Sequence, residues 1–170
     1  NDLFSSEKRV EKEGIKLVNN SLYFTKNDEL TKRKILINFL YRYIEDFING
    51  IENSMVISYL NNFFTSSELL LVERFLKNIS EHNLKSNELY KTFYMYLIIT
   101  IQRIKTNNLI LKNENSNFLK TTQEFKKINK EIVFLEKNLG ILFDENEKLQ
   151  IADFLIGLFF QFQLERKKAL

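Results

Sequence analysis

One stretch of the chain decides its fold: residues 89–103, which read LYKTFYMYLIITIQR. The stretch is apolar for most of its length. It contains neither Pro nor Gly, the two residues that most disfavour a helix interior. We therefore expect it to lie in a helix from about Ser86 to Thr106. Arg103 stands near the end of this apolar helix, and Tyr96 stands seven residues before the arginine.

This arrangement resembles the signature helix of the PTS-regulation domain (PRD). That domain is the sugar-uptake sensor of BglG-type antiterminators and of MtlR- and Mga-type activators. The family helix carries a histidine seven residues before an arginine, and the histidine receives a phosphoryl group from the sugar phosphotransferase system. Imidazole carries phosphoryl reversibly near neutral pH, whereas a phenol with a pKa near 10 is a poor substitute. Because Tyr96 stands at the histidine position, the resemblance implies a regulator fold without the usual switch at this site.

The C-terminal part of the chain extends the resemblance. The family places an aromatic residue near the start of the next helix and later a Gly-Ile pair, an acidic cap and a glutamate, an order matched here by Phe118, Phe125, Gly140-Ile141, Asp144-Glu145 and Glu147. Many members carry a second phosphorylatable histidine seven residues after that glutamate, and here Phe154 occupies the position. The resemblance is best over residues 68–162, and it implies that both phosphorylation positions are substituted.

The remaining sequence after Asp28 has helical periodicity, so we expect a mainly α, PRD-like helical bundle. Asp28 can cap the first helix, and Thr65 with Glu68 has the form of a capping box. Asp144 with Glu147 has the same form. Besides the signature helix, the expected helices cover residues 28–48, 54–64, 65–80, 116–138 (one helix or a broken pair, stopped by Gly140) and 144–167.

The first 28 residues differ from this pattern. Ile15–Val18 and Ser21–Phe24 are short β-prone runs joined by Asn19-Asn20, a two-residue connection of the hairpin type. A hairpin placed here is either the end of a winged helix-turn-helix domain or an N-terminal arm folded on the bundle. We therefore divide the chain at residue 28, with a helical regulatory domain at 29–170. Because the chain begins at Asn1 without Met, we expect it to be a piece of a longer protein.

Composition narrows the class of protein. The chain has 170 residues, 44% of them hydrophobic, with 16 Phe, enough for one compact helical core. It has no Cys, which fits a reducing cytoplasm and excludes disulfides and thiolate metal sites. A net charge of +3 does not indicate strong nucleic-acid binding by the whole chain. No stretch is apolar for the roughly 20 residues that a membrane span needs, so we expect no membrane partner.

Two sets of basic residues are candidates for binding. Arg103 contacts either an external anion or partner, or an internal carboxylate, because an arginine on an apolar helix needs a counter-charge. If the N-terminal hairpin belongs to a winged helix, a group of cations can touch nucleic-acid phosphates; otherwise these residues form an ordinary solvated face. That group comprises Lys8, Arg9, Lys12 and Lys16.

Nothing in the sequence indicates catalysis. It has no Gly-rich phosphate loop, nucleophile elbow or metal motif, and its single histidine, His82, lies in a polar segment that reads as a solvated loop. Tyr90, Tyr94 and Tyr96 either line a cleft or pack in the core. We therefore expect no enzyme, cofactor or metal.

The functional prediction is a regulatory and dimerisation module of a bacterial transcription regulator, located in the cytoplasm. It would link a signal to DNA or RNA binding by another segment, with phosphotransferase proteins as partners that do not phosphorylate it. The alternative is a helical protein-interaction module without a transcriptional role. We expect a homodimer, with contacts drawn from Leu70, Leu71, Phe75, Phe159, Phe160 and Phe162, unless these side chains fill the bundle's own core.

Overall fold

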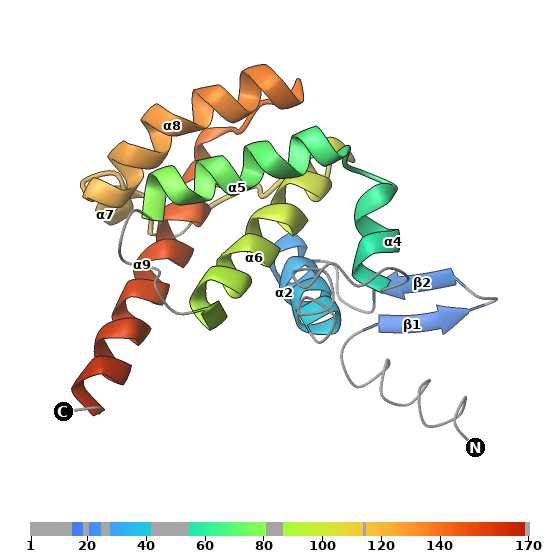
Figure 1. Cartoon of the computed structure of the whole chain (residues 1–170), viewed down its shortest axis with the longest axis horizontal. Coiled ribbons are helices and arrows are strands. Elements are labelled where there is room, and N and C mark those ends of the chain that lie inside the picture. The colour runs from blue at the N-terminus through green and yellow to red at the C-terminus, as the bar shows by residue number, and fades with distance from the viewer. Residues whose placement is uncertain are drawn as a thin grey trace.

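The computed structural model describes residues 15–18, 21–24, 28–41, 55–80, 87–113 and 115–168, with side chains of the last helix described as far as Leu158. Figure 1 shows a mainly α arrangement, as the sequence predicts. Its elements are β1 (Ile15–Val18), β2 (Ser21–Phe24), α2 (Glu29–Tyr41), α4 (Met55–Asn61), α5 (Ser66–Ser80), α6 (Asn87–Lys105), α7 (Ser116–Leu119), α8 (Gln123–Leu139) and α9 (Glu145–Lys168).

The helix ends follow local chemistry. Asp28 Oδ2 accepts from Thr31 N at 2.9 Å and so begins α2. At the start of α5, Thr65 and Glu68 form a complete capping box. The Glu68 backbone N–H donates to Thr65 Oγ1, and the Thr65 N–H donates to Glu68 Oε1. Gly140 ends α8 with φ of 66°, a left-handed conformation that glycine adopts without steric cost.

One predicted helix is divided in two. Residues 116–138 were expected to form one helix or a broken pair, and the structure has α7 and α8. Thr122 separates them, because its hydroxyl accepts from Phe125 N at 3.2 Å and begins α8. The expected extension of α2 to Ile48 lies outside the described residues.

The helices form two layers. α5 and α8 lie side by side, run in opposite directions and cover α6 and α9 (Figure 1). α2 packs against α6 on another side. Every residue from Phe93 to Gln102 is buried, so α6 is enclosed on all its faces. The stretch that decides the fold therefore forms the centre of the core.

The N-terminal strands pair as an antiparallel hairpin, with Ile15 opposite Phe24 and Val18 opposite Ser21. They coincide with the two β-prone runs of the sequence. Lys8, Arg9 and Lys12 lie outside the described residues, and Lys16 lies in β1. The assignment of residues 1–28 to a winged helix stays a prediction. Among the described helices, none is both long and apolar enough to cross a bilayer.

Candidate functional site

The two positions that the sequence aligned with family histidines meet in space. Tyr96 on α6 and Phe154 on α9 stack face to face, with ring centroids 4.0 Å apart and planes at 6°. Phe93 lies one turn away on α6, with its centroid 6.3 Å from that of Tyr96 and 5.9 Å from that of Phe154. We call these three rings the aromatic stack. Both substituted positions are therefore parts of one packed contact between α6 and α9.

The Tyr96 side chain is shielded from water. It is 5% exposed, and its hydroxyl makes no hydrogen bond within the described part of the chain. Burial raises the pKa of the Tyr96 phenol well above its usual value, although the nearby positive charge of Arg33 opposes the shift. Since the phenolate is the nucleophilic form, Tyr96 stays protonated and unreactive at neutral pH.

A buried ion pair lies beside the aromatic stack. Arg33 on α2 holds Glu147 on α9 through two hydrogen bonds, Nη1 to Oε2 at 2.6 Å and Nη2 to Oε1 at 2.7 Å. The two side chains are 2% and 0% exposed. Glu147 Oε1 also accepts from Ile110 N at 3.1 Å, and Arg33 Nη2 also donates to the Asn108 carbonyl at 2.9 Å. This is the bidentate arginine–carboxylate geometry that gives the strongest paired contacts.

Glu29 extends the ion pair to a second arginine. Its Oε1 accepts from Arg33 Nε at 3.0 Å and from Arg103 Nε at 2.8 Å, and its Oε2 accepts from Arg103 Nη2 at 2.9 Å. Burial alone would raise the pKa of Glu29, but hydrogen bonds from Arg103 and Arg33 outweigh burial and lower it. We call Glu29, Arg33, Arg103 and Glu147 the charged clamp, because it joins α2, α6 and α9.

The sequence left the partners of the charged clamp open or hidden. Arg103 has an internal carboxylate partner, one of the two alternatives that the sequence left open. Arg33 is buried, although it lies between Lys32 and Lys34 in a run of three cations, a pattern typical of a solvated surface. Glu147 was expected to complete a capping box with Asp144. Its N–H does donate to Asp144 Oδ1 at 2.9 Å, but its carboxylate points to Arg33 instead.

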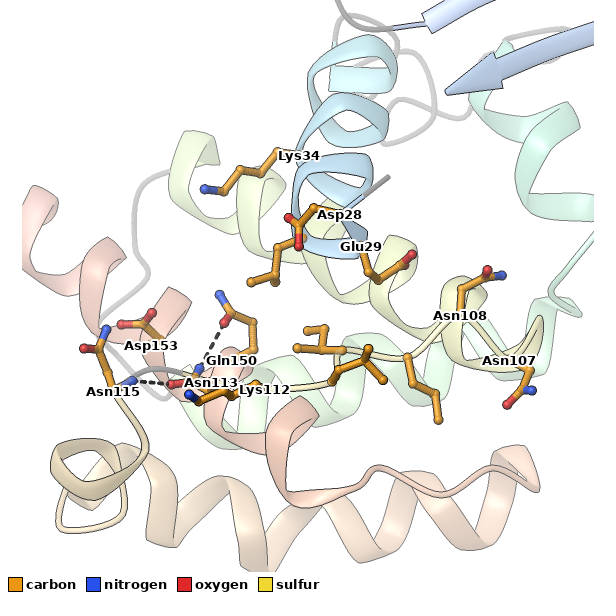
Figure 2. Close-up of a pocket in the computed structure, with 14 residues that line it drawn as sticks. Asp28, Glu29, Lys34, Asn107, Asn108, Lys112, Asn113, Asn115, Gln150 and Asp153 are labelled. Atoms are coloured by element: carbon orange, nitrogen blue, oxygen red, sulfur yellow. Dashed lines mark hydrogen bonds between the residues drawn. The ribbon is translucent and has the colours of Figure 1, made fainter. Parts of the chain in front are cut away.

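A polar cleft of about 940 Å³ lies next to the clamp, between the start of α2, the segment after α6 and the side of α9. Figure 2 shows Asp28, just before α2, and Lys34 on α2 across the cleft from Gln150 and Asp153 on α9. One of its edges is fixed by a hydrogen bond from Asn113 Nδ2 to Gln150 Oε1 at 3.1 Å. Amides, carboxylates and ammonium groups line the cleft together with apolar side chains, so it offers hydrogen bonds, charges of both signs and apolar contact. The apolar residues are Leu30, Leu109, Ile110 and Leu111.

The other candidate residues lie in the core or outside the described residues. Tyr90 and Tyr94 stack on each other with centroids 6.3 Å apart, and Tyr94 is buried in the core. Phe75 is also in the core, the alternative that the sequence left open for the proposed dimer-contact residues, whereas Leu70 is 64% exposed. His82 and the side chains of Phe159, Phe160 and Phe162 are not among those described. In the described ranges no three His, Cys or acidic side chains are grouped to hold a metal ion.

Comparison with known proteins gives one match. The family model described as the PRD domain matches residues 70–158, more than half of the chain, and this range contains α6, α8 and the first part of α9. No curated protein and no solved structure matches the chain.

Proposed function

We propose a function from the premise that this chain belongs to the PRD domain family. It is the regulatory module of a bacterial transcription regulator, an activator or an antiterminator, and it acts in the cytoplasm. It links a signal to DNA or RNA binding by another segment of the protein. The module works as a homodimer, since symmetric dimers are the commonest oligomers and family domains act through dimerisation.

The observation that supports this proposal is the stacked pair at the two histidine positions. In the family these positions take up and lose phosphoryl groups. Here a phenol and a phenyl ring fill them, in contact at 4.0 Å, and neither carries a nucleophile that works at neutral pH. The module therefore keeps the regulatory fold, and a stacked aromatic contact between α6 and α9 takes the place of its phosphoryl switch. Phosphotransferase proteins do not phosphorylate it.

The charged clamp supplies a route for the signal. Arg103 and Glu147 lie inside the range that matches the family, and Glu29 and Arg33 lie before it on α2. α2 is the helix that follows the N-terminal hairpin in sequence. A shift of α9 relative to α6 would change the geometry of these four charges and so the position of α2. The clamp thus couples the family core to the segment that precedes it.

The loss of the phosphoryl switch is tested by measuring whether a radiolabelled phosphoryl group is transferred to the chain. The chain is incubated with radiolabelled phosphoenolpyruvate, enzyme I and HPr, and the products are separated on a gel. We expect label on HPr, which serves as the internal control, and none on the chain. Acid-labile label on the chain, mapped to His82, would mean that phosphoryl control has moved rather than disappeared.

The transcriptional role is tested with the full-length protein in its own cell. Its bound DNA is recovered by chromatin immunoprecipitation, and its bound RNA by ultraviolet cross-linking. We expect enrichment of promoter DNA or of leader RNA, together with altered transcript levels of the same genes when the protein is deleted. If neither nucleic acid is enriched and transcript levels stay the same, the module is a protein-interaction domain without a transcriptional role.

A further inference from the structure

The outer layer of the domain carries a charge asymmetry that the regulatory role does not use. On α5 and α8, the helices of this layer, every charged side chain classed as exposed is basic. No Asp or Glu of these two helices is exposed. The exposed cations are Arg74 and Lys77 on α5 and Lys126, Lys130 and Lys137 on α8. We call these five residues the basic face.

The five cations form two rows that lie side by side. Positions 126, 130 and 137 repeat at near-helical spacing and share the outer side of α8, as positions 74 and 77 do on α5. The Arg74 guanidinium on α5 lies 5.1 Å from the centre of the Phe134 ring on α8. This contact brings the α5 row next to α8. Figure 1 shows the two helices on the same outer side of the molecule.

The carboxylates of these helices do not neutralise the basic face from the solvent side. Glu68 is paired with Lys105 at 2.7 Å, and Glu136 accepts from Phe143 N at 3.0 Å. The other three, Glu73, Glu124 and Glu131, are half-buried on the flanks. The net charge of the whole chain is only +3, but on α5 and α8 the cations are exposed while the carboxylates are less exposed.

We propose that the basic face binds the phosphate backbone of a nucleic acid, independently of its sequence. The row on α8 runs from Lys126 to Lys137, a length of about 16 Å at the rise of an α-helix. A duplex carries one phosphate charge per about 1.7 Å of axis with both strands counted, so this length of duplex carries roughly ten negative charges, of which one side faces the row. Lysines and an arginine whose neighbouring carboxylates are all less exposed than they are suit a uniform row of phosphates. This goes beyond the proposed function, in which another segment binds the nucleic acid.

The test uses the whole chain and a fluorescent 20-base-pair duplex of mixed sequence, with anisotropy measured from 25 to 200 mM NaCl. We expect log K to fall linearly with log[NaCl]. Five phosphate contacts would give a slope of about −4.5, and each cation removed would reduce it by about 0.9. The triple variant Lys126→Gln, Lys130→Gln, Lys137→Gln should therefore lose roughly 2.7 of that slope and most of the affinity.

A matched triple variant serves as the control. Lys34→Gln, Lys112→Gln and Lys120→Gln remove the same charge from exposed positions outside the basic face, and we expect the slope to keep nearly its full value. Thermal melting should show that both variants fold. The proposal is overturned if the duplex is not bound at 25 mM NaCl, or if both triple variants lose affinity equally.

A second comparison separates nucleic acid from an acidic protein. Leu70 and Val133, 64% and 58% exposed, lie on the same two helices and would suit a protein partner. We expect Leu70→Ser with Val133→Ser to leave duplex affinity unchanged, and poly-glutamate to bind more weakly than the duplex. Tighter binding to poly-glutamate would assign the face to acidic polypeptides and reject nucleic acid. Because the duplex has no regulatory sequence, failure here leaves the proposed transcriptional role standing.

Discussion

The aromatic stack and the charged clamp join α6 to α9 by opposite means. The stack is apolar and stabilises the fold through area removed from water and ring contact. The clamp takes four charges into or near the interior, where the cost of removing their water offsets most of their attraction. A buried ion pair therefore contributes little to the net free energy of unfolding. It does restrict its two side chains to one relative position, because any other position leaves a buried charge unpaired. We infer that the stack holds the helices together and that the clamp sets where α2 lies on them.

Removal of one clamp partner should have the largest effect on stability. Glu147→Gln leaves Arg33 buried with a neutral partner in place of a carboxylate at 2.6 and 2.7 Å. We expect the free energy of unfolding to fall by about 3–5 kcal/mol, as when other buried pairs lose one member. Urea unfolding followed by circular dichroism measures the difference.

Glu145→Gln is the matched control, because Glu145 lies in the same first turn of α9. Its side chain is 60% exposed and pairs with Lys120 at the surface, so its loss should cost less than about 1 kcal/mol. The double change Arg33→Met, Glu147→Leu sharpens the comparison. If the clamp mainly sets position, this apolar pair restores most of the stability lost by Glu147→Gln. A double variant no more stable than Glu147→Gln would show instead that the charges themselves stabilise the fold.

Removal of a ring from the aromatic stack should have a smaller effect. Phe154 is half-buried, so Phe154→Ala should cost less than the 3–5 kcal/mol typical of a fully buried ring, or about 2–3 kcal/mol. Phe118→Ala is the control, since Phe118 is 67% exposed and should change the free energy of unfolding by less than about 0.5 kcal/mol. Equal losses in the two variants would mean that the stack contributes no more than surface packing.

Sequence reasoning predicted the features that depend on near neighbours. Thr65 and Glu68 are three positions apart and predict the start of α5, and Gly140 predicts the end of α8. The matching of positions 96 and 154 to the family's histidines stays a prediction, and nothing in the family pattern said that the two rings touch.

The charged clamp could not be found in this way. Arg33 and Glu147 are 114 positions apart, and each has a local explanation that hides its partner. Arg33 is one of three consecutive cations, and Glu147 is at the N3 position of a capping box that starts at Asp144. A long-range ion pair has no period and no fixed spacing. Only packing, here of α2 against α6 beside α9, brings such charges together.

The smallest effect should come from the Tyr96 hydroxyl, because the stack needs the ring and not the oxygen. That hydroxyl is buried without a hydrogen bond in the described part of the chain, so Tyr96→Phe leaves no partner unsatisfied. At pH 7 we expect the free energy of unfolding to change by less than about 1 kcal/mol.

At pH 11 the Tyr96→Phe variant should have a larger free energy of unfolding than the wild type. The folded pKa of Tyr96 is raised by burial, so the wild type loses stability once the pH rises above the unfolded value near 10, where only the unfolded phenol ionises. The variant escapes this loss, which approaches about 1.4 kcal/mol one pH unit above that value. Urea unfolding of both proteins at pH 7 and pH 11 measures the difference. A variant markedly less stable at pH 7 would reveal a hydrogen bond to the hydroxyl. The stack would then be fixed by a directional polar contact, as the clamp is.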